Sequence, residues 1–174
     1  SSGLIEDPTD AIQAVNQSIG QGTVLVTPLQ VASFMAALGN GGTLYRPQLI
    51  EKIQPLTDDP TSIFKPEARG TLPLSPEYLR VLQDAMISVV ENQRGTAYSR
   101  LRSIRSYGIP VAGKTGTAES GSGLPHGWFA GYTMAEENTG LPDIAIAVLV
   151  ENAGEGSDYA APIFQRIVET YYFG

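Results

Sequence analysis

Hydrophobic positions recur with a helical period in two stretches of the first half of the chain. The first stretch, 27–42 (TPLQVASFMAALGNGG), opens with a threonine and a proline, residues that suit the start of a helix. Gln30 stands three residues after Thr27, which is the spacing of a capping box. The run GNGG at 39–42 is typical of a helix end. The pattern therefore predicts one helix across this stretch.

The second helical stretch is predicted to begin at 75–77 (SPE), where a serine precedes a proline and a glutamate. The following apolar residues fall on one stripe of a helix, and they are Tyr78, Leu79, Leu82, Met86, Val89 and Val90. A short helix is also expected from about Ala97 to Ser103.

The residues between these helices suggest irregular structure. We expect 43–54 (TLYRPQLIEKIQ) to be extended, and Pro47 favours an edge strand or an irregular one. Residues 55–74 carry four prolines among polar residues, so the sequence predicts a loop there.

After residue 108 the period of the pattern changes from that of a helix to that of a strand. Three extended segments are predicted at 110–119 (PVAGKTGTAE), 126–135 (HGWFAGYTMA) and 143–152 (DIAIAVLVEN). The connectors ESGSGLP and EENTGLP are short, which favours antiparallel hairpins, because parallel strands need a crossover of a dozen or more residues. A last helix is expected from about Ala160 to Tyr172, with Asp158 as its cap. The sequence thus predicts an α+β fold, an antiparallel sheet with a C-terminal helix and further helices packed on it.

Composition narrows the possible partners. The chain has 174 residues, 42% of them hydrophobic, which is enough for one domain with a core. It has no apolar run near twenty residues, so we expect it to be soluble. The net charge of −7 argues against nucleic acid, and the four arginines of 94–105 are better explained as a solvated face. With no cysteine and one histidine, we expect no metal ion and no cofactor.

Lys114 fits two motifs that place it on different structures. GIPVAGKT at 108–115 matches G-x-x-x-x-G-K-T, the pattern of a phosphate-binding loop. Such a loop leaves a buried strand and enters a helix directly. Here the preceding RLRSIRSY is too charged for a buried strand, and the following GTAESGSGLP has three glycines and a proline. We therefore predict a strand and no nucleotide site.

On such a strand the residues around Lys114 form an unusual set. Gly113 and Gly116 let another backbone approach closely, and alternation places the hydroxyls of Thr115 and Thr117 on one face, opposite Lys114. An ammonium and two hydroxyls beside glycines suit an anionic, peptide-like ligand. An ordinary exposed edge strand, on which the lysine opposes aggregation, fits these residues equally well.

Five blocks in order extend the pattern across nearly the whole chain. They are SIGQGTVLVTPLQVASFMAALGNGGTLYRPQLI, VAGKTGTAE, HGWFAGYT, DIAIAVLVEN and AAPIFQRIVETYY. This succession closely resembles the C-terminal part of the transpeptidase domain of penicillin-binding proteins, where KTG is a known signature. The IGQG and TPLQ motifs look most like those of the class B, monofunctional type. The resemblance implies the serine β-lactamase/transpeptidase-like fold.

The resemblance also implies a function and roles for residues. The family cross-links peptidoglycan as D,D-transpeptidases and is acylated by β-lactams. Lys114 would supply positive field, and the hydroxyls of Thr115 and Thr117 would hold the substrate carboxylate. The backbone N–H of Thr117 would provide half of the oxyanion hole. Gly116 and Glu119 would line the same groove.

Four further residues receive expectations from the same resemblance. Gln21 would lie near the base of the cleft. For His126 a structural hydrogen bond is favoured over a catalytic role. Trp128 and Phe129 are expected to form core and groove wall instead of binding ligand.

The chain departs from the family in its nucleophile. The Ser-x-x-Lys and Ser-x-Asn motifs of the family should precede SIGQG, and no Ser-x-Asn occurs in the sequence. One Ser-x-x-Lys occurs at 62–65, but it follows the 27–42 helix and Pro66 opposes helical geometry at Lys65. We therefore expect Ser62 not to be a nucleophile.

The chain is thus predicted to be the C-terminal portion, residues 1–174, of a transpeptidase domain that lacks its nucleophile-bearing part, and to be inactive alone. The opening SSGLIEDPTD, without an initiator methionine, suggests an internal or engineered boundary. Expected partners are peptidoglycan stem peptides, β-lactams and the missing N-terminal part of the domain. The parent protein would be anchored in the cell membrane, with this domain on the extracytoplasmic side. A non-catalytic β-lactam or muropeptide sensor module and a β-lactamase remain as alternatives.

Overall fold

The computed structural model describes residues 3–56, 59, 61–121 and 123–174. Parts of three predicted segments lie outside these residues, namely the first two residues of the opening, three residues of 55–74 and one residue of the 119–125 connector. The elements in chain order are α1 (Ala11–Ser18), α2 (Pro28–Gly39), β1 (Thr43–Tyr45), β2 (Lys52–Ile53), β3 (Ser62–Ile63), β4 (Ala68–Thr71), α3 (Pro76–Glu91), α4 (Arg102–Ser106), β5 (Val111–Ala118), β6 (His126–Thr133), α5 (Glu136–Thr139), β7 (Ala145–Val150) and α6 (Gly156–Phe173).

The two helices predicted in the first half begin at the capping residues that the sequence indicates. The Thr27 hydroxyl accepts a hydrogen bond from the backbone N–H of Gln30, and the Gln30 side chain accepts one from the backbone N–H of Thr27, so the predicted capping box is present. At the start of α3, the Ser75 hydroxyl accepts from the backbone N–H of Tyr78. Local sequence therefore determines where these helices begin.

The apolar stripe predicted for α3 is only partly correct. Leu79, Met86 and Val90 are buried as expected, whereas Tyr78 and Leu82 are exposed. The helix turns a narrower face to the core than its apolar pattern suggests.

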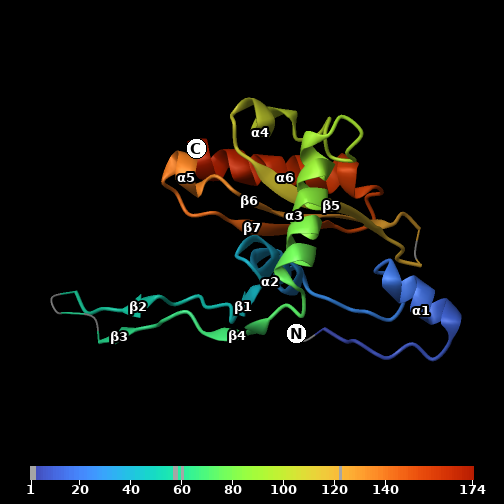
Figure 1. Cartoon of the computed structure of the whole chain (residues 1–174), viewed down its shortest axis with the longest axis horizontal. Coiled ribbons are helices and arrows are strands. Elements are labelled where there is room, and N and C mark those ends of the chain that lie inside the picture. The colour runs from blue at the N-terminus through green and yellow to red at the C-terminus, as the bar shows by residue number, and fades with distance from the viewer. Residues whose placement is uncertain (1–2, 57–58, 60, 122) are drawn as a thin grey trace.

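The second half folds into the predicted antiparallel sheet, with strand order β5-β6-β7. In the register of the first pair Lys114 lies opposite Ala130 and Thr117 lies opposite Gly127. The helix α6 covers one face of the sheet, and α2 packs on the other face (Figure 1). The helix α3 crosses β5 and contributes to the cores on both faces, through Met86 on the α2 side and Val90 on the α6 side.

Glycines let the α6 layer approach the sheet closely. A Cβ at Gly113 would lie 2.6 Å from Cζ of Phe129, whose ring is fully buried and meets Phe164 of α6 edge-on at 4.7 Å. A Cβ at Gly156, the first residue of α6, would overlap the carbonyl oxygens of Trp128 and Gly116. The start of α6 is thus in backbone contact with β5 and β6.

Two helix boundaries differ from the predictions. The last helix begins at Gly156 instead of about Ala160, and its cap is Glu155, which makes no side-chain capping bond. Asp158 lies in the first turn of this helix, where it pairs with Arg100 at 2.7 Å. The short helix expected at 97–103 lies instead at Arg102–Ser106, and turns precede it.

The 55–74 segment was wrongly predicted to be a loop. It contains β3 and β4, which pair with β2 and β1 respectively, so the described residues between 43 and 71 form a long two-stranded arm (Figure 1). The prediction of a broken extended segment at 43–54 is confirmed, because β1 ends at Tyr45 and β2 begins at Lys52. The strands have only two and four residues, and the composition of 55–74 therefore did not reveal them.

The helix α1 was not predicted. Its cap is Asp10, whose side chain accepts from the backbone N–H of Gln13 at 2.8 Å. None of its residues is buried, and its apolar residues Ile12 and Val15, three positions apart, are exposed. Among the described residues, no helix has the length and apolar character to cross a lipid bilayer.

A polar cluster joins the C-terminal end of α6 to the end of the sheet where β6 ends and β7 begins. The hydroxyl of Thr133, which is buried, lies 2.8 Å from the hydroxyl of Tyr172 and donates to Asp143 at 2.9 Å. Asp143 also accepts from the backbone N–H of Ala135 at 2.6 Å. Burial raises the pKa of Tyr172 above its ordinary value, so this phenol stays neutral and its stabilising contribution is lost only as the pH rises through that raised pKa.

Tyr132 presents the opposite situation. Its side chain is 4% exposed, and its hydroxyl has no hydrogen-bond partner among the described residues. Burial, together with the charge of Asp84, raises its pKa. The ring packs flat against Gly39, where a Cβ would lie 2.9 Å from Cδ2 of Tyr132.

These two tyrosines should respond differently to removal of the hydroxyl. Tyr172→Phe should lower the free energy of unfolding by about 1 kcal/mol, because Thr133 and Asp143 lose a partner. Tyr132→Phe should be neutral or stabilising by up to about 1 kcal/mol, because a buried hydroxyl without a partner costs free energy. Urea unfolding of both variants measures the difference. A loss above about 1 kcal/mol in Tyr132→Phe would show that its hydroxyl has a partner after all.

Candidate functional site

The site is built on one side of β5. Met134 donates its backbone N–H to the carbonyl of Pro110 at 2.9 Å, so the even-numbered residues of β5 exchange ladder bonds with β6. The N–H and C=O groups of Thr115 and Thr117 must then point away from β6. We call this side of β5, from Lys114 to Ala118, the open edge. Residues 111–113 are buried, whereas Lys114 and Thr117 are exposed.

Both outward carbonyls of the open edge accept hydrogen bonds from side chains. The ammonium of Lys114 donates to the carbonyl of Thr115 at 2.7 Å. The amide of Gln21, 96 residues away in sequence, donates to the carbonyl of Thr117 at 3.0 Å. Although Lys114 alternates with the threonines, its side chain bends back and brings its charge to the edge that they share.

The backbone N–H of Thr117 therefore points away from β6, on the same side as the carbonyl that Gln21 contacts. The predicted placement of Thr115 and Thr117 on one face follows from the regular register of β5. The hydroxyl of Thr115 lies 2.9 Å from that of Thr96. An ammonium, hydroxyls and an outward N–H thus converge on one short stretch of edge.

The start of α6 supports the strand from behind. Gly156 touches the backbone of Gly116, so no side chain fits between the helix and the strand at this point. On the other face, a Cβ at Gly116 would lie 3.1 Å from Cβ of Trp128. Because Gly116 has no side chain, β5 packs closely between α6 and Trp128 at the site.

The remaining predicted residues lie as follows. Glu119 is exposed one residue beyond the end of β5. His126 accepts a hydrogen bond at Nδ1 from the backbone N–H of Asn152 at 3.0 Å, which agrees with a structural role. Phe129 is fully buried core, as expected, and Trp128 is half-buried.

Two contacts of this site were missed by sequence reasoning. Gln21 was placed near the cleft without a role, and Thr96 was passed over as part of the arginine-rich stretch. Each reaches β5 from a separate segment, and a capping or periodicity rule detects contacts only within a segment. The short motif SIGQG, with glycines flanking the glutamine, was the one available signal for Gln21.

The Ser-x-x-Lys sequence has a geometry unsuited to catalysis. Ser62 lies on β3 and pairs with Ile53 of β2 in the arm, not at the start of a helix. Three residues of extended chain span roughly 10 Å, so Ser62 and Lys65 are not one helical turn apart. The arm also extends away from the β5-β6-β7 sheet (Figure 1). The expectation that this motif does not start a helix is confirmed.

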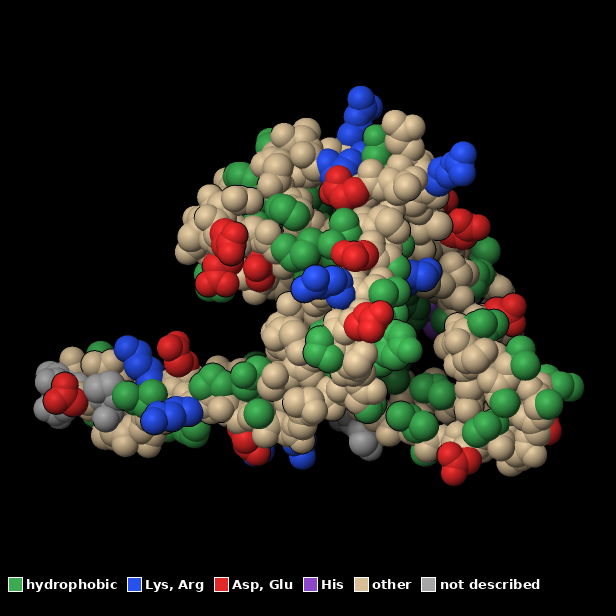
Figure 2. Space-filling view, viewed as in Figure 1, with side chains coloured by type: hydrophobic (Ala, Val, Ile, Leu, Met, Phe, Trp, Pro, Cys, Tyr) green, Lys and Arg blue, Asp and Glu red, His purple; other side chains and the backbone are tan. Residues whose placement is uncertain are grey.

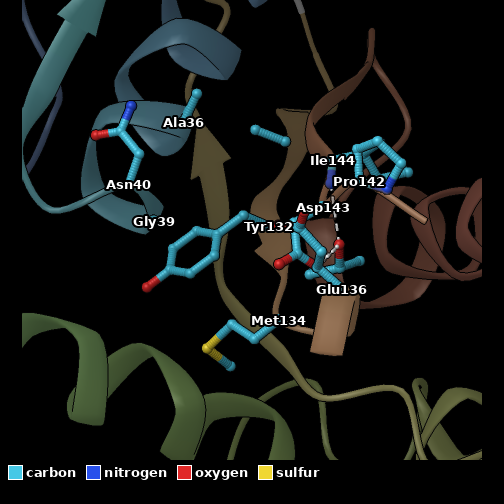
Figure 3. Close-up of a pocket in the computed structure, with 11 residues that line it drawn as sticks. Ala36, Gly39, Asn40, Tyr132, Met134, Glu136, Pro142, Asp143 and Ile144 are labelled. Carbon is cyan, nitrogen blue, oxygen red and sulfur yellow. Dashed lines mark hydrogen bonds between the residues drawn. The ribbon is translucent and has the colours of Figure 1, made fainter. Parts of the chain in front are cut away.

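A cavity of about 410 Å³ lies elsewhere on the molecule. It is bounded by the end of α2 and the ends of β6 and β7, with Tyr132, Met134 and Asp143 among its walls (Figure 3). Thr133 at this end of β6 pairs with Val111, six residues before Thr117, so the cavity is roughly 20 Å along the strand from Thr117. None of the predicted site residues lines it.

Comparisons with known proteins relate the whole chain to one family. Residues 1–169 match the family described as "Penicillin binding protein transpeptidase domain". Peptidoglycan D,D-transpeptidase PbpA of Mycolicibacterium smegmatis is 34% identical over 165 residues, which cover 88% of this chain and 31% of the relative. Peptidoglycan D,D-transpeptidase MrdA of Haemophilus influenzae is 28% identical over 90% of this chain and 25% of the relative.

Solved structures agree with these matches. Penicillin-binding protein A from M. tuberculosis, in its ceftriaxone acyl-enzyme complex, superimposes with a TM-score of 0.81 at 28% identity, covering 100% of this chain and 38% of that one. The likeness confirms the predicted α+β fold. The chain spans 25% to 38% of the length of these three proteins.

The geometry predicts that 108–115 binds no nucleotide. No helix follows Thr115, because β5 continues to Ala118 and a turn-rich connector leads into β6. Titration of ATP with magnesium, followed by calorimetry and by thermal shift, should give no signal. Micromolar binding would contradict the assignment of this segment to an edge strand.

Proposed function

Because the chain belongs to the penicillin-binding protein transpeptidase family, we propose that it is the C-terminal part of a peptidoglycan D,D-transpeptidase of the class B type. In this proposal the open edge of β5 binds the carboxylate of a stem peptide and provides half of the oxyanion hole for cell-wall cross-linking. The observation that carries the proposal is the convergence of the Lys114 ammonium, the Thr115 hydroxyl and the outward backbone of Thr117 on this edge.

The residues of the edge match the charges of the proposed reaction. The substrate ends in a D-alanine carboxylate, to which the hydroxyls of Thr115 and Thr117 can donate in the field of Lys114. Each charge-assisted hydrogen bond contributes roughly 1.5–3 kcal/mol. The N–H of Thr117 would stabilise the oxyanion that forms when a serine attacks the carbonyl of the penultimate residue, and one such donor is worth about 2.7–4 kcal/mol. Gly116 and Glu119 would border the groove.

In this proposal the attacking serine comes from outside this chain, because the one Ser-x-x-Lys sequence, at Ser62, lies on the arm. The surface of the chain is consistent with a large missing partner. Large hydrophobic side chains are exposed on α1, directly after it and along α2, namely Ile12, Val15, Ile19, Leu29 and Phe34. Figure 2 shows hydrophobic groups gathered over this part of the molecule. We infer that the nucleophile-bearing part of the domain covers these residues, because isolated folds rarely leave so much apolar surface in water.

The same proposal names the ligands and the location. Stem peptides would be the substrates, and β-lactams would acylate the completed site. The parent protein would be anchored in the cell membrane with this domain on the extracytoplasmic side. Relatives described as D,D-transpeptidases favour a cell-wall synthase over a sensor module or a β-lactamase.

Lys114→Ala tests whether the lysine serves the reaction or only the fold. In a protein that joins this chain to the nucleophile-bearing part, the variant should acylate with penicillin at least tenfold more slowly, because a cation near the carboxylate is lost. The melting temperature should change little, since an exposed edge lysine contributes little stability. Lys52→Ala, on the exposed strand β2, is the matched control and should leave acylation unchanged. Normal acylation together with a large loss of stability would make Lys114 structural.

This chain alone should form no covalent adduct with a β-lactam. A serine hydroxyl is a weak nucleophile until a base within hydrogen-bond reach takes its proton, and the arm holds Ser62 and Lys65 too far apart for that. Intact-mass spectrometry after incubation with penicillin measures the adduct directly. Addition of the nucleophile-bearing part as a second chain should restore labelling on that chain. Stoichiometric labelling at Ser62 of this chain alone would overturn the proposal.

A further inference from the structure

Thr96 reaches the proposed carboxylate site from outside β5. It lies in the turn that follows α3, 19 residues before Thr115, and the two hydroxyl oxygens are 2.9 Å apart. Thr96 is exposed and Thr115 is half-buried, so the pair lies at the surface beside the open edge.

The turn that carries Thr96 is held on both sides. Ala97 is fully buried in the core and donates its backbone N–H to the carbonyl of Val89 at 3.1 Å, while Gly95 donates to the carbonyl of Asn92 at 2.7 Å. A Cβ at Gly95 would overlap the carbonyl of Val89, so the turn folds tightly back onto the end of α3. With Gly95 and Ala97 held in this way, the backbone of Thr96 is held beside Thr115.

Hydroxyl chemistry gives this contact a direction when an anion is bound. A threonine hydroxyl has one proton to donate and two lone pairs with which to accept. If Thr115 donates its proton to a carboxylate, its oxygen can accept only from another donor, and Thr96 is in place at 2.9 Å. A hydroxyl that accepts a hydrogen bond also becomes a stronger donor.

We propose that Thr96 is a positioning residue of the carboxylate site: it donates to Oγ1 of Thr115 and directs the Thr115 proton toward the bound carboxylate. This inference rests on the proposed function of the open edge. Thr96 itself takes no part in the covalent step, and its effect passes through Thr115.

The test uses a protein that joins this chain to the nucleophile-bearing part. Thr96→Val removes the hydroxyl at nearly constant shape, Thr96→Ser keeps it, and Ser99→Ala removes a hydroxyl from the same turn as a control. Acylation is followed by intact mass with benzylpenicillin and with its methyl ester, and the dependence on concentration separates binding from the acylation step.

Thr96→Val should lower the second-order rate constant for acylation by benzylpenicillin about tenfold, which is the range expected for one lost hydrogen bond that orients a charged one. The loss should lie mainly in binding, and Thr96→Ser should restore the rate. The methyl ester, which has no carboxylate charge, should acylate the unsubstituted protein and Thr96→Val at the same rate. In a Thr115→Val background the Thr96→Val change should have no further effect, because the residue through which it acts is gone.

Three results, each obtained while the unsubstituted protein is labelled, would overturn the inference alone. They are an unchanged acylation rate in Thr96→Val, equal losses of rate with benzylpenicillin and with its methyl ester, and additive losses of rate in the double variant Thr96→Val/Thr115→Val. A failure of the unsubstituted protein to label would overturn the proposed function and this inference with it. Melting temperatures of all variants show whether a fall in acylation rate comes from misfolding. A fall in rate that comes from misfolding and that Thr96→Ser does not restore counts against the inference.

Discussion

The site depends on the contact between the start of α6 and the backbones of β5 and β6. Gly156 lies where any side chain would overlap the carbonyls of Trp128 and Gly116, and Phe129 lies over Gly113 with its ring against Phe164. These contacts fix β5 from behind while leaving its outer side uncovered. The helix α3 also packs against β5, whose first residues 111–113 are buried, and the exposed part begins at Lys114. The position of the site along β5 is thus a consequence of packing on its back and at its beginning.

Local rules recovered the parts of the fold that local contacts determine. The capping box of Thr27 and Gln30 and the cap at Ser75 are made by neighbouring residues, and the helices begin there. The start of α6 was misplaced because its cap, Glu155, makes no side-chain bond, while the more conventional candidate Asp158 pairs with Arg100. The strands β3 and β4 are short, and the prolines and polar residues around them in 55–74 concealed them.

The same distinction applies to the candidate site. The strand that carries Lys114, Thr115 and Thr117 was recognisable because glycine, lysine and threonine stand at fixed spacings within one segment. The bonds from Gln21 and Thr96 join segments 96 and 19 residues apart, and a single sequence contains no rule that pairs them. Their discovery required the register of β5, which decides which backbone groups and which hydroxyls face outward.

The two explanations that the sequence allowed for Lys114 turn out to be compatible. An exposed strand edge invites pairing with other chains, and native proteins oppose this with charged side chains or by occupying the edge groups. Here the Lys114 ammonium and the Gln21 amide occupy the outward carbonyls of Thr115 and Thr117. Both are donors, so they satisfy the acceptors of the edge and leave its N–H groups facing outward. An edge protected in this way disfavours a new strand, which needs acceptors and donors in alternation, while it still offers donors and positive charge to an anion. The side chains that occupy the acceptors of the edge therefore also leave it with the donors and charge that the proposed binding of a carboxylate and an oxyanion needs.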